Sequence, residues 1–161
     1  MKSKKLTYTV EEAKKRLERY CSYQDRCHKE VEQKLFEMNM IPEACELILL
    51  HLMDKDFLNE ERFARSFARG KFNIKSWGKN RIILELKKRK ISKYNIDTAL
   101  KEIDEDAYHD KVKFIAVKKY ELLSEPDTFK KRKKLIDFLL RKGFENYLVY
   151  DVVKEITLNV K

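Results

Sequence analysis

The chain has 161 residues, which suits one domain or a short array of repeats. Hydrophobic residues make up 43% of it, too many for a disordered tail, and charged residues make up 40%, with a formal net charge of +10. The sequence contains no long apolar run, so we expect no membrane span and no signal peptide. Because it has only 3 glycines and 2 prolines, the composition favours long helices over a turn-rich β fold.

The first predicted elements are a basic tail over residues 1–10 and a three-helix unit over residues 11–58. Apolar residues recur every four positions over residues 11–22 and share one face of a predicted helix. These residues are Ala13, Leu17 and Cys21. A second helix follows, and Asn39 is expected to end it in the left-handed conformation. Pro42 suits the first turn of the third helix.

The second predicted unit covers residues 59–105. Asn59 is expected to cap a helix over residues 59–71, whose buried face carries Phe63 and Phe67. Two more helices follow. Lys90 occupies the position that ends the first of them, where we expect strain or a different turn, and Ser92 is able to cap the next.

The third predicted unit covers residues 106–161. Its first helix spans residues 106–123, and the stretch 124–127, which contains Pro126, breaks it before the last helix pair. Gly143 suits the turn within that pair because glycine takes the left-handed conformation readily.

A threefold repeat underlies these units, since residues 31–52, 82–103 and 135–156 align without gaps. Such agreement across a helix, a turn and a second helix is hard to obtain by chance. The apolar columns are Val31/Ile82/Leu135, Leu35/Leu86/Leu139, Met40/Ile91/Phe144, Cys45/Ile96/Val149, Ile48/Ala99/Val152, Leu49/Leu100/Val153 and Leu52/Ile103/Ile156. The sequence therefore predicts an all-α fold of three tandem three-helix repeats, in which neighbouring units share interfaces.

The sequence shows no motif for catalysis, metal binding or nucleotide binding. Cys21, Cys27 and Cys45 are odd in number and form no C-x-x-C pair, so we expect reduced thiols in the cytoplasm and no metal. There is no glycine-rich phosphate loop and no nucleophile elbow, and no carboxylate pair stands out as catalytic, since Glu60 and Glu61 suit the start of a helix. We therefore expect no cofactor and no enzymatic activity.

The positive charge is clustered along predicted helices, which is typical of surfaces that bind phosphate groups. The candidate binding residues are Lys79, Arg81, Lys87, Lys88, Arg89, Lys130, Lys131, Arg132, Lys133, Lys134, Arg141 and Lys142. A merely solvated face is the alternative for each single residue. Trp77 and Tyr94 are of a type that stacks on bases, although a lone tryptophan near a helix start more often packs into a core.

Several stretches resemble the RecX regulatory proteins. The most specific is Phe57–Phe67, with its acidic-Arg-Phe-Ala helix start. Trp77–Ile82 and Leu84–Leu86 resemble the middle helix of that family's second unit, and Glu30–Leu35 matches its Glu-Leu-x-x-Lys-Leu pattern. Cys27 stands where the family often has a capping serine, so we expect a weaker helix cap there.

The resemblance implies three three-helix units in an extended, curved array. It also implies a regulator that lies in the groove of the RecA–DNA filament and mostly inhibits recombinase and co-protease activity in DNA repair and the SOS response. Expected partners are therefore the RecA recombinase filament and DNA, bound without sequence preference by a monomer. The alternative is a basic helical nucleic-acid-binding protein with no specific protein partner.

Overall fold

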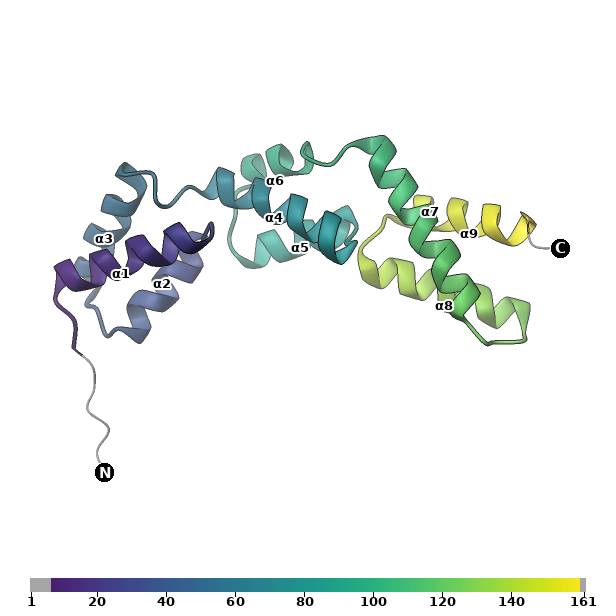
Figure 1. The fold of residues 1–161 in the computed structure, drawn as a ribbon, viewed down its shortest axis with the longest axis horizontal. Coiled ribbons are helices and arrows are strands. Elements are labelled where there is room, and N and C mark those ends of the chain that lie inside the picture. The colour runs from purple at the N-terminus through teal and green to yellow at the C-terminus, as the bar shows by residue number, and fades with distance from the viewer. Residues whose placement is uncertain (1–6, 160–161) are drawn as a thin grey trace, which may run out of the picture.

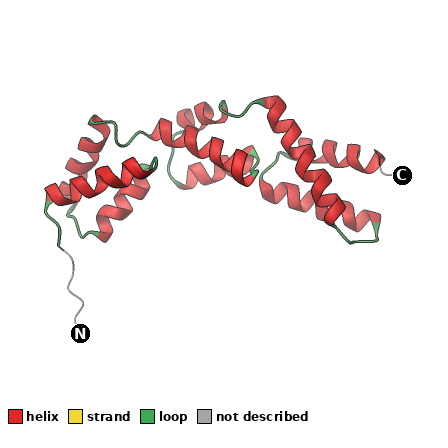
Figure 2. Ribbon diagram, in the orientation of Figure 1, coloured by secondary structure: helices red, strands yellow, loops and turns green. Residues whose placement is uncertain are grey.

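The computed structural model describes residues 7–159 and contains nine α-helices in that range, with no strand there. The helices form an extended, curved array, with α1–α3 at one end, α4–α6 in the middle and α7–α9 at the other end (Figures 1 and 2). Their bounds are α1 Val10–Tyr23, α2 His28–Glu37, α3 Pro42–Asp54, α4 Glu60–Lys75, α5 Lys79–Lys88, α6 Lys93–Leu100, α7 Glu105–Leu122, α8 Thr128–Lys142 and α9 Asn146–Asn159. The predicted all-α repeat fold is confirmed.

The predicted unit limits of 11–58, 59–105 and 106–161 stay predictions, but we use them to name repeats 1, 2 and 3. Of the predicted tail, residues 1–6 lie outside the described residues, and so do residues 160–161. Helix α1 begins at Val10, which is within the predicted tail. Thr9 caps it, because the Thr9 side chain accepts a hydrogen bond from the Glu12 amide.

Side-chain caps start the helices where the sequence predicts them. The Arg62 amide donates to the Asn59 side chain at 3.0 Å, and the Asn95 amide donates to the Ser92 hydroxyl at 3.2 Å. Cys27 provides no such cap to α2. Instead, the His28 amide donates to the Glu60 carboxylate at 3.3 Å, so repeat 2 supplies the cap that repeat 1 lacks.

The three repeats end their middle helices in the same way. The stop positions Asn39, Lys90 and Gly143 have φ values of 58°, 58° and 98°, so all three are left-handed. The next residue in each repeat donates its amide to a carbonyl five positions back. These donor–acceptor pairs are Met40–Leu35, Ile91–Leu86 and Phe144–Leu139. Lys90 therefore keeps the shared turn and accepts the strain, on the order of 1 kcal/mol, that a side chain brings to this conformation.

One helix runs further than its predicted end. α4 continues past Lys71 to Lys75 because Phe72 extends its buried face. It stops at Ser76, which has a φ of 56°, and the Trp77 amide closes the turn on the Lys71 carbonyl at 3.1 Å. The four-residue spacing of the apolar residues Ala68 and Phe72 indicates in the sequence that the helix continues past Lys71.

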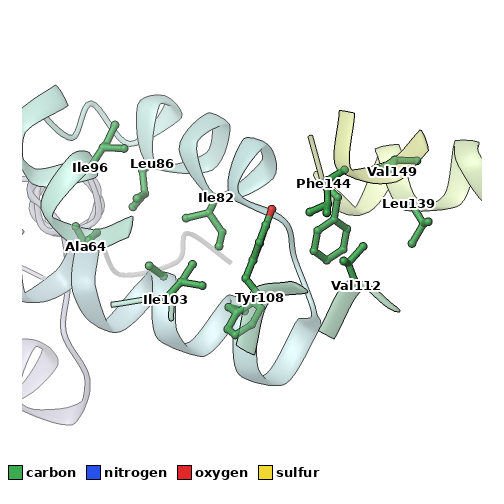
Figure 3. Packing of buried hydrophobic residues seen from close by; sticks show 14 of the residues in the cluster. Ala64, Ile82, Leu86, Ile96, Ile103, Tyr108, Val112, Leu139, Phe144 and Val149 are labelled. Carbon is green, nitrogen blue, oxygen red and sulfur yellow. The ribbon is translucent and has the colours of Figure 1, made fainter. Parts of the chain in front are cut away.

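The buried side chains form two cores rather than three. The smaller core lies within repeat 1 and is closed by Leu58. The larger core joins repeats 2 and 3, and Cys27 is the only described residue before position 59 that belongs to it. Within it Tyr108 lies between Ile82 and Phe144 (Figure 3), and its ring centroid is 5.4 Å from that of Phe144.

Repeats 2 and 3 also meet through their backbones. The Gly78 amide donates to the Lys142 carbonyl at 2.7 Å, and the Asn80 amide donates to the Gly143 carbonyl at 2.9 Å. The buried Tyr108 hydroxyl accepts from the Lys79 amide at 3.0 Å and donates to the Glu145 carboxylate. Burial, together with the hydrogen bond to Glu145, raises the pKa of Tyr108, so the hydroxyl keeps the proton that it donates.

Repeats 1 and 2 meet mainly through charged groups. The Arg62 guanidinium bonds to the Asp25 carboxylate at 2.7 Å and to the Asp56 carboxylate at 3.0 Å, and the hydrogen bond to Asp25 raises the pKa of Arg62. The Lys29 ammonium donates to the Lys88 carbonyl at 3.0 Å. This contact is more exposed and more polar than the one between repeats 2 and 3.

The array is longer than a compact protein of the same size. Its accessible surface is 11097 Å², whereas a compact protein of its mass exposes about 8,500 Å². A compact chain of this length has a radius of gyration of roughly 15 Å. We expect small-angle scattering to give a clearly larger value, and a value near 15 Å would contradict the extended arrangement.

Candidate nucleic-acid interface

The first predicted basic group lies at the C-terminal end of α5, beside repeat 1. Glu85 accepts hydrogen bonds from Lys88 at 3.2 Å and Arg89 at 3.1 Å, which lower the pKa of its carboxyl. The Arg89 guanidinium also covers the ring of Phe67 at 4.8 Å. Lys87 is exposed and has no ion-pair partner among residues 7–159, so it is the member whose charge is most available.

The second group gathers where α8 ends against the start of α5. The Arg81 guanidinium donates to the Arg141 carbonyl at 3.4 Å, and the Lys142 ammonium donates to the Lys75 carbonyl at 3.1 Å. We call Lys71, Lys75, Arg81, Arg141 and Lys142 the junction cluster. The fold thus brings basic residues from α4, α5 and α8 together, although 67 positions separate Lys75 from Lys142 in the sequence.

Trp77 lies within the junction cluster but packs partly against the core. The Arg81 guanidinium lies 4.2 Å from the centroid of its ring and the Lys71 ammonium lies 5.0 Å away. Lys79 has a different role. Its ammonium pairs with Glu105 and lies 4.7 Å from the Tyr108 ring centroid, so its charge supports the contact between repeats 2 and 3.

The third and densest group occupies the first turns of α8. Lys131 covers the Tyr120 ring at 4.0 Å, and Lys134 pairs with Glu125 at 3.1 Å. The other three residues are exposed and have no ion-pair partner in the described part of the chain. They are Lys130, Arg132 and Lys133. We call these three the α8 basic turn.

The position of the α8 basic turn argues against a role in stability. Positive charge near a helix N-terminus opposes the helix dipole, and each such charge costs on the order of 0.3–1 kcal/mol at low salt. Asp127 caps the helix by accepting from the Lys130 amide at 2.9 Å, which offsets part of this cost. The charges therefore do not help the helix to form, and they stay predicted contacts for an anionic partner.

The predicted residues do not form one patch. Lys130 and Arg141 lie eleven positions apart on α8, which is roughly 16 Å along the helix axis. The α5 group lies further along the array, beside repeat 1 (Figure 1). The arrangement is therefore a row of three basic sites, which matches an elongated anionic partner better than a small ligand.

The search for basic runs in the sequence missed basic residues in repeat 1. Arg16, Arg19 and Lys34 line an open hollow of about 800 Å³, together with Tyr8 and Tyr20. Lys29 reaches α5 from the same repeat. The spacing of Arg16 and Arg19, three residues apart on one helix, was the only signal, and it is weak because helices carry many such pairs.

Other candidate chemistry is missing from the described residues. No group of three or more histidine, cysteine, aspartate or glutamate side chains is placed to hold a metal ion within residues 7–159. Burial raises the pKa of Cys21 and Cys27 to about 11, so neither thiol is a nucleophile at neutral pH. None of the described helices is long and apolar enough to cross a membrane.

Comparison with known proteins identifies the family. A sequence model of the second three-helix domain of RecX matches residues 59–100, and one of the third three-helix domain matches residues 106–153. The chain belongs to the RecX family. Its members are regulatory proteins, and the family is not one of enzymes.

Individual RecX proteins match across most of the chain. The regulatory protein RecX of Clostridium botulinum (strain Eklund 17B / Type B) is 31% identical over 147 residues, which are 90% of this chain and 66% of the relative. That of Clostridioides difficile (strain 630) is 28% identical over 84% of this chain and 61% of the relative. The chain therefore spans about three fifths to two thirds of the length of these curated relatives.

The structures agree as well. The crystal structure of RecX from Lactobacillus salivarius superposes with a TM-score of 0.80 at 28% identity, over 92% of this chain and 97% of that one. A second RecX crystal structure gives a TM-score of 0.82 at 26% identity, over 91% of this chain and 73% of that one. These matches confirm the helical repeat fold in the RecX family.

Proposed function

We propose that this chain regulates the RecA recombinase by binding the RecA–DNA filament, and that it mostly inhibits recombinase and co-protease activity. Membership of the RecX family, whose relatives are named regulatory proteins, is the observation that carries this proposal. The partners are the filament and DNA, the chain acts as a monomer in the cytoplasm, and it performs no catalysis.

The shape of the molecule supports a polymeric partner. An extended repeat array presents a long surface that is able to span several subunits of a filament. Many weak contacts along one chain add up, because each contact raises the effective concentration for the next. Three separated basic sites suit such distributed binding.

The α8 basic turn and the junction cluster are the proposed contact sites. Their charges lie in exposed or half-buried side chains, and none has an ion-pair partner among residues 7–159. Phosphate groups of DNA and acidic side chains of a filament are both complementary to them. Lys87 is the proposed contact of the α5 group, because its neighbours Lys88 and Arg89 are already paired with Glu85.

The alternative function, binding of nucleic acid alone, rests on the same basic residues. A titration of RecA strand exchange separates the two functions. If the filament is the target, inhibition occurs at protein concentrations far below those that coat the DNA. If nucleic acid is the only partner, inhibition appears only when the DNA is covered.

Neutralising the α8 basic turn tests the contact sites. We expect Lys130→Gln, Arg132→Gln and Lys133→Gln together to weaken binding to DNA and to RecA filaments. The slope of log affinity against log salt should become shallower by about 0.9 for each phosphate of duplex DNA that the variant no longer neutralises, or about 2.7 for three. Fluorescence anisotropy over a range of salt concentrations measures both quantities.

The matched control neutralises three lysines that already pair with acidic groups, namely Lys14, Lys55 and Lys113. This control changes the net charge equally and should preserve the salt slope. Both variants should stay folded by circular dichroism, because the substitutions lie outside the cores. If the two triple variants bind alike, the α8 basic turn is not a contact site.

A further inference from the structure

The helix α3 is apolar on more sides than its packing requires. Within residues 44–53 only Glu46 and His51 are polar. One face, with Ala44, Ile48 and Leu52, is buried in the core of repeat 1. A helix that is apolar all round is expected to be covered all round, yet three large side chains face solvent. Leu47 is 62% exposed, Leu50 56% and Met53 46%.

Two of these side chains, Leu50 and Met53, line a groove of about 500 Å³ between α2 and α3. The groove is lined mainly by apolar side chains. They are Phe36, Met40, Cys45, Leu49, Leu50 and Met53. Monomeric proteins seldom expose contiguous apolar surface of this kind unless it binds something.

The rim of this groove is acidic, in a chain whose net charge is +10. Glu32 and Glu46 line it, and the exposed Glu43 stands beside it in the first turn of α3. His28 also lines the groove, but its ring nitrogen lies 3.5 Å from the Glu60 carboxylate of repeat 2. None of the three carboxylates has a hydrogen-bond or ion-pair partner among residues 7–159. The basic sites proposed for DNA lie in α4, α5 and α8, on the other two repeats. The rim therefore repels nucleic acid and attracts cationic groups.

We propose that this groove binds an amphipathic helix of a protein partner, with an apolar stripe on one face and lysine or arginine along its flanks. Apolar side chains at positions i, i+3, i+4 and i+7 of the partner fill the groove. Its basic flanks pair with the three carboxylates, which fixes the orientation and the choice of partner. Repeat 1 is then a protein-docking module. This docking role would hold whether or not RecA is the protein that the chain regulates.

Binding of labelled model peptides to the full chain tests this docking site. The probe is a short helical peptide with leucine at i, i+3, i+4 and i+7 and lysine on both flanks, and its counterpart carries glutamate in place of lysine. We expect saturable binding of the lysine peptide and at least about tenfold weaker binding of the glutamate peptide. Added salt should reduce this preference.

Substitutions in the groove and on its rim identify where the peptide binds. Leu50→Asp should weaken binding of the lysine peptide by about tenfold or more. Leu84→Asp, on α5, is the matched control because Leu84 is 53% exposed, and it should leave binding unchanged. The combined change Glu32→Lys, Glu43→Lys and Glu46→Lys should reverse the preference in favour of the glutamate peptide. Circular dichroism checks that each variant is folded.

Three results would overturn the proposal. The first is equal affinity for the two peptides, which would mean that the rim charges do not select. The second is unchanged binding in Leu50→Asp. The third is self-association of the unmodified chain in sedimentation that Leu50→Asp abolishes, because a second copy would then cover the groove. Strand-exchange inhibition is not a readout here, so failure of this proposal leaves the proposed function standing.

Discussion

Replacing Phe144 by alanine is expected to lower the free energy of unfolding by about 3–5 kcal/mol. The ring is 1% exposed and packs against Tyr108 in the core that repeats 2 and 3 share. Its removal leaves a cavity that backbone hydrogen bonds on both sides keep from collapsing. Urea unfolding followed by circular dichroism measures the change. Phe129→Ala is the matched control, because that ring is 78% exposed and its removal should alter stability by only about 0.5 kcal/mol.

The destabilisation caused by Phe144→Ala should also have a definite location. Amide hydrogen exchange should accelerate through α4–α9, since these helices share one core, and change little in α1–α3, which have their own. Equal acceleration in all helices would show that the two cores unfold as one unit. Acceleration confined to α7–α9 would show that repeats 2 and 3 are not coupled.

Gly78→Ala is expected to lower the free energy of unfolding by about 1–3 kcal/mol or to open the contact between repeats 2 and 3. A Cβ at Gly78 would lie 2.3 Å from the Gly143 carbonyl carbon and equally close to the Phe144 amide nitrogen. Both are backbone atoms, so no side chain is able to turn aside. Thermal unfolding and small-angle scattering together distinguish reduced stability from opening of the contact.

Gly70→Ala provides the matched control for Gly78→Ala. Gly70 lies within α4, and a Cβ there meets no atom within 4 Å. Alanine favours a helix interior over glycine by about 0.5–1 kcal/mol, so this variant should be slightly more stable than the original chain. If the two substitutions had the same effect, close backbone approach would not be what holds repeats 2 and 3 together.

The fold was predictable because repetition supplied the information that single helices lack. Apolar spacing alone fits many helix arrangements, but the column that contains Met40, Ile91 and Phe144 also located the shared turn. Lys90 shows where residue preference misleads, since the turn keeps its geometry despite the side chain. The sequence predicted that neighbouring repeats share interfaces. It did not show that repeats 2 and 3 merge into one core while repeat 1 keeps its own, because that depends on contacts between distant segments.

The candidate site was less predictable, because the number of charges in a run does not reveal their partners. Lys79 pairs with Glu105, which lies 26 positions away. Lys88 and Arg89 share Glu85. By contrast, the α8 basic turn remains without ion pairs among the described residues, although Lys134 of the same run pairs with Glu125. The junction cluster needed the fold itself, since Lys75 and Lys142 meet only when repeats 2 and 3 pack.

The two contacts between repeats differ in stiffness. Repeats 2 and 3 are joined by buried aromatic rings and short backbone hydrogen bonds, whereas repeats 1 and 2 are joined largely by the Arg62 ion pairs and the exposed Lys29 contact. Ions in solution screen the second contact far more than the first. The contact between repeats 1 and 2 is therefore expected to weaken with added salt more than the contact between repeats 2 and 3. If the chain binds a filament as proposed, the salt-sensitive contact between repeats 1 and 2 is where the array would adjust its curvature to a change in filament pitch.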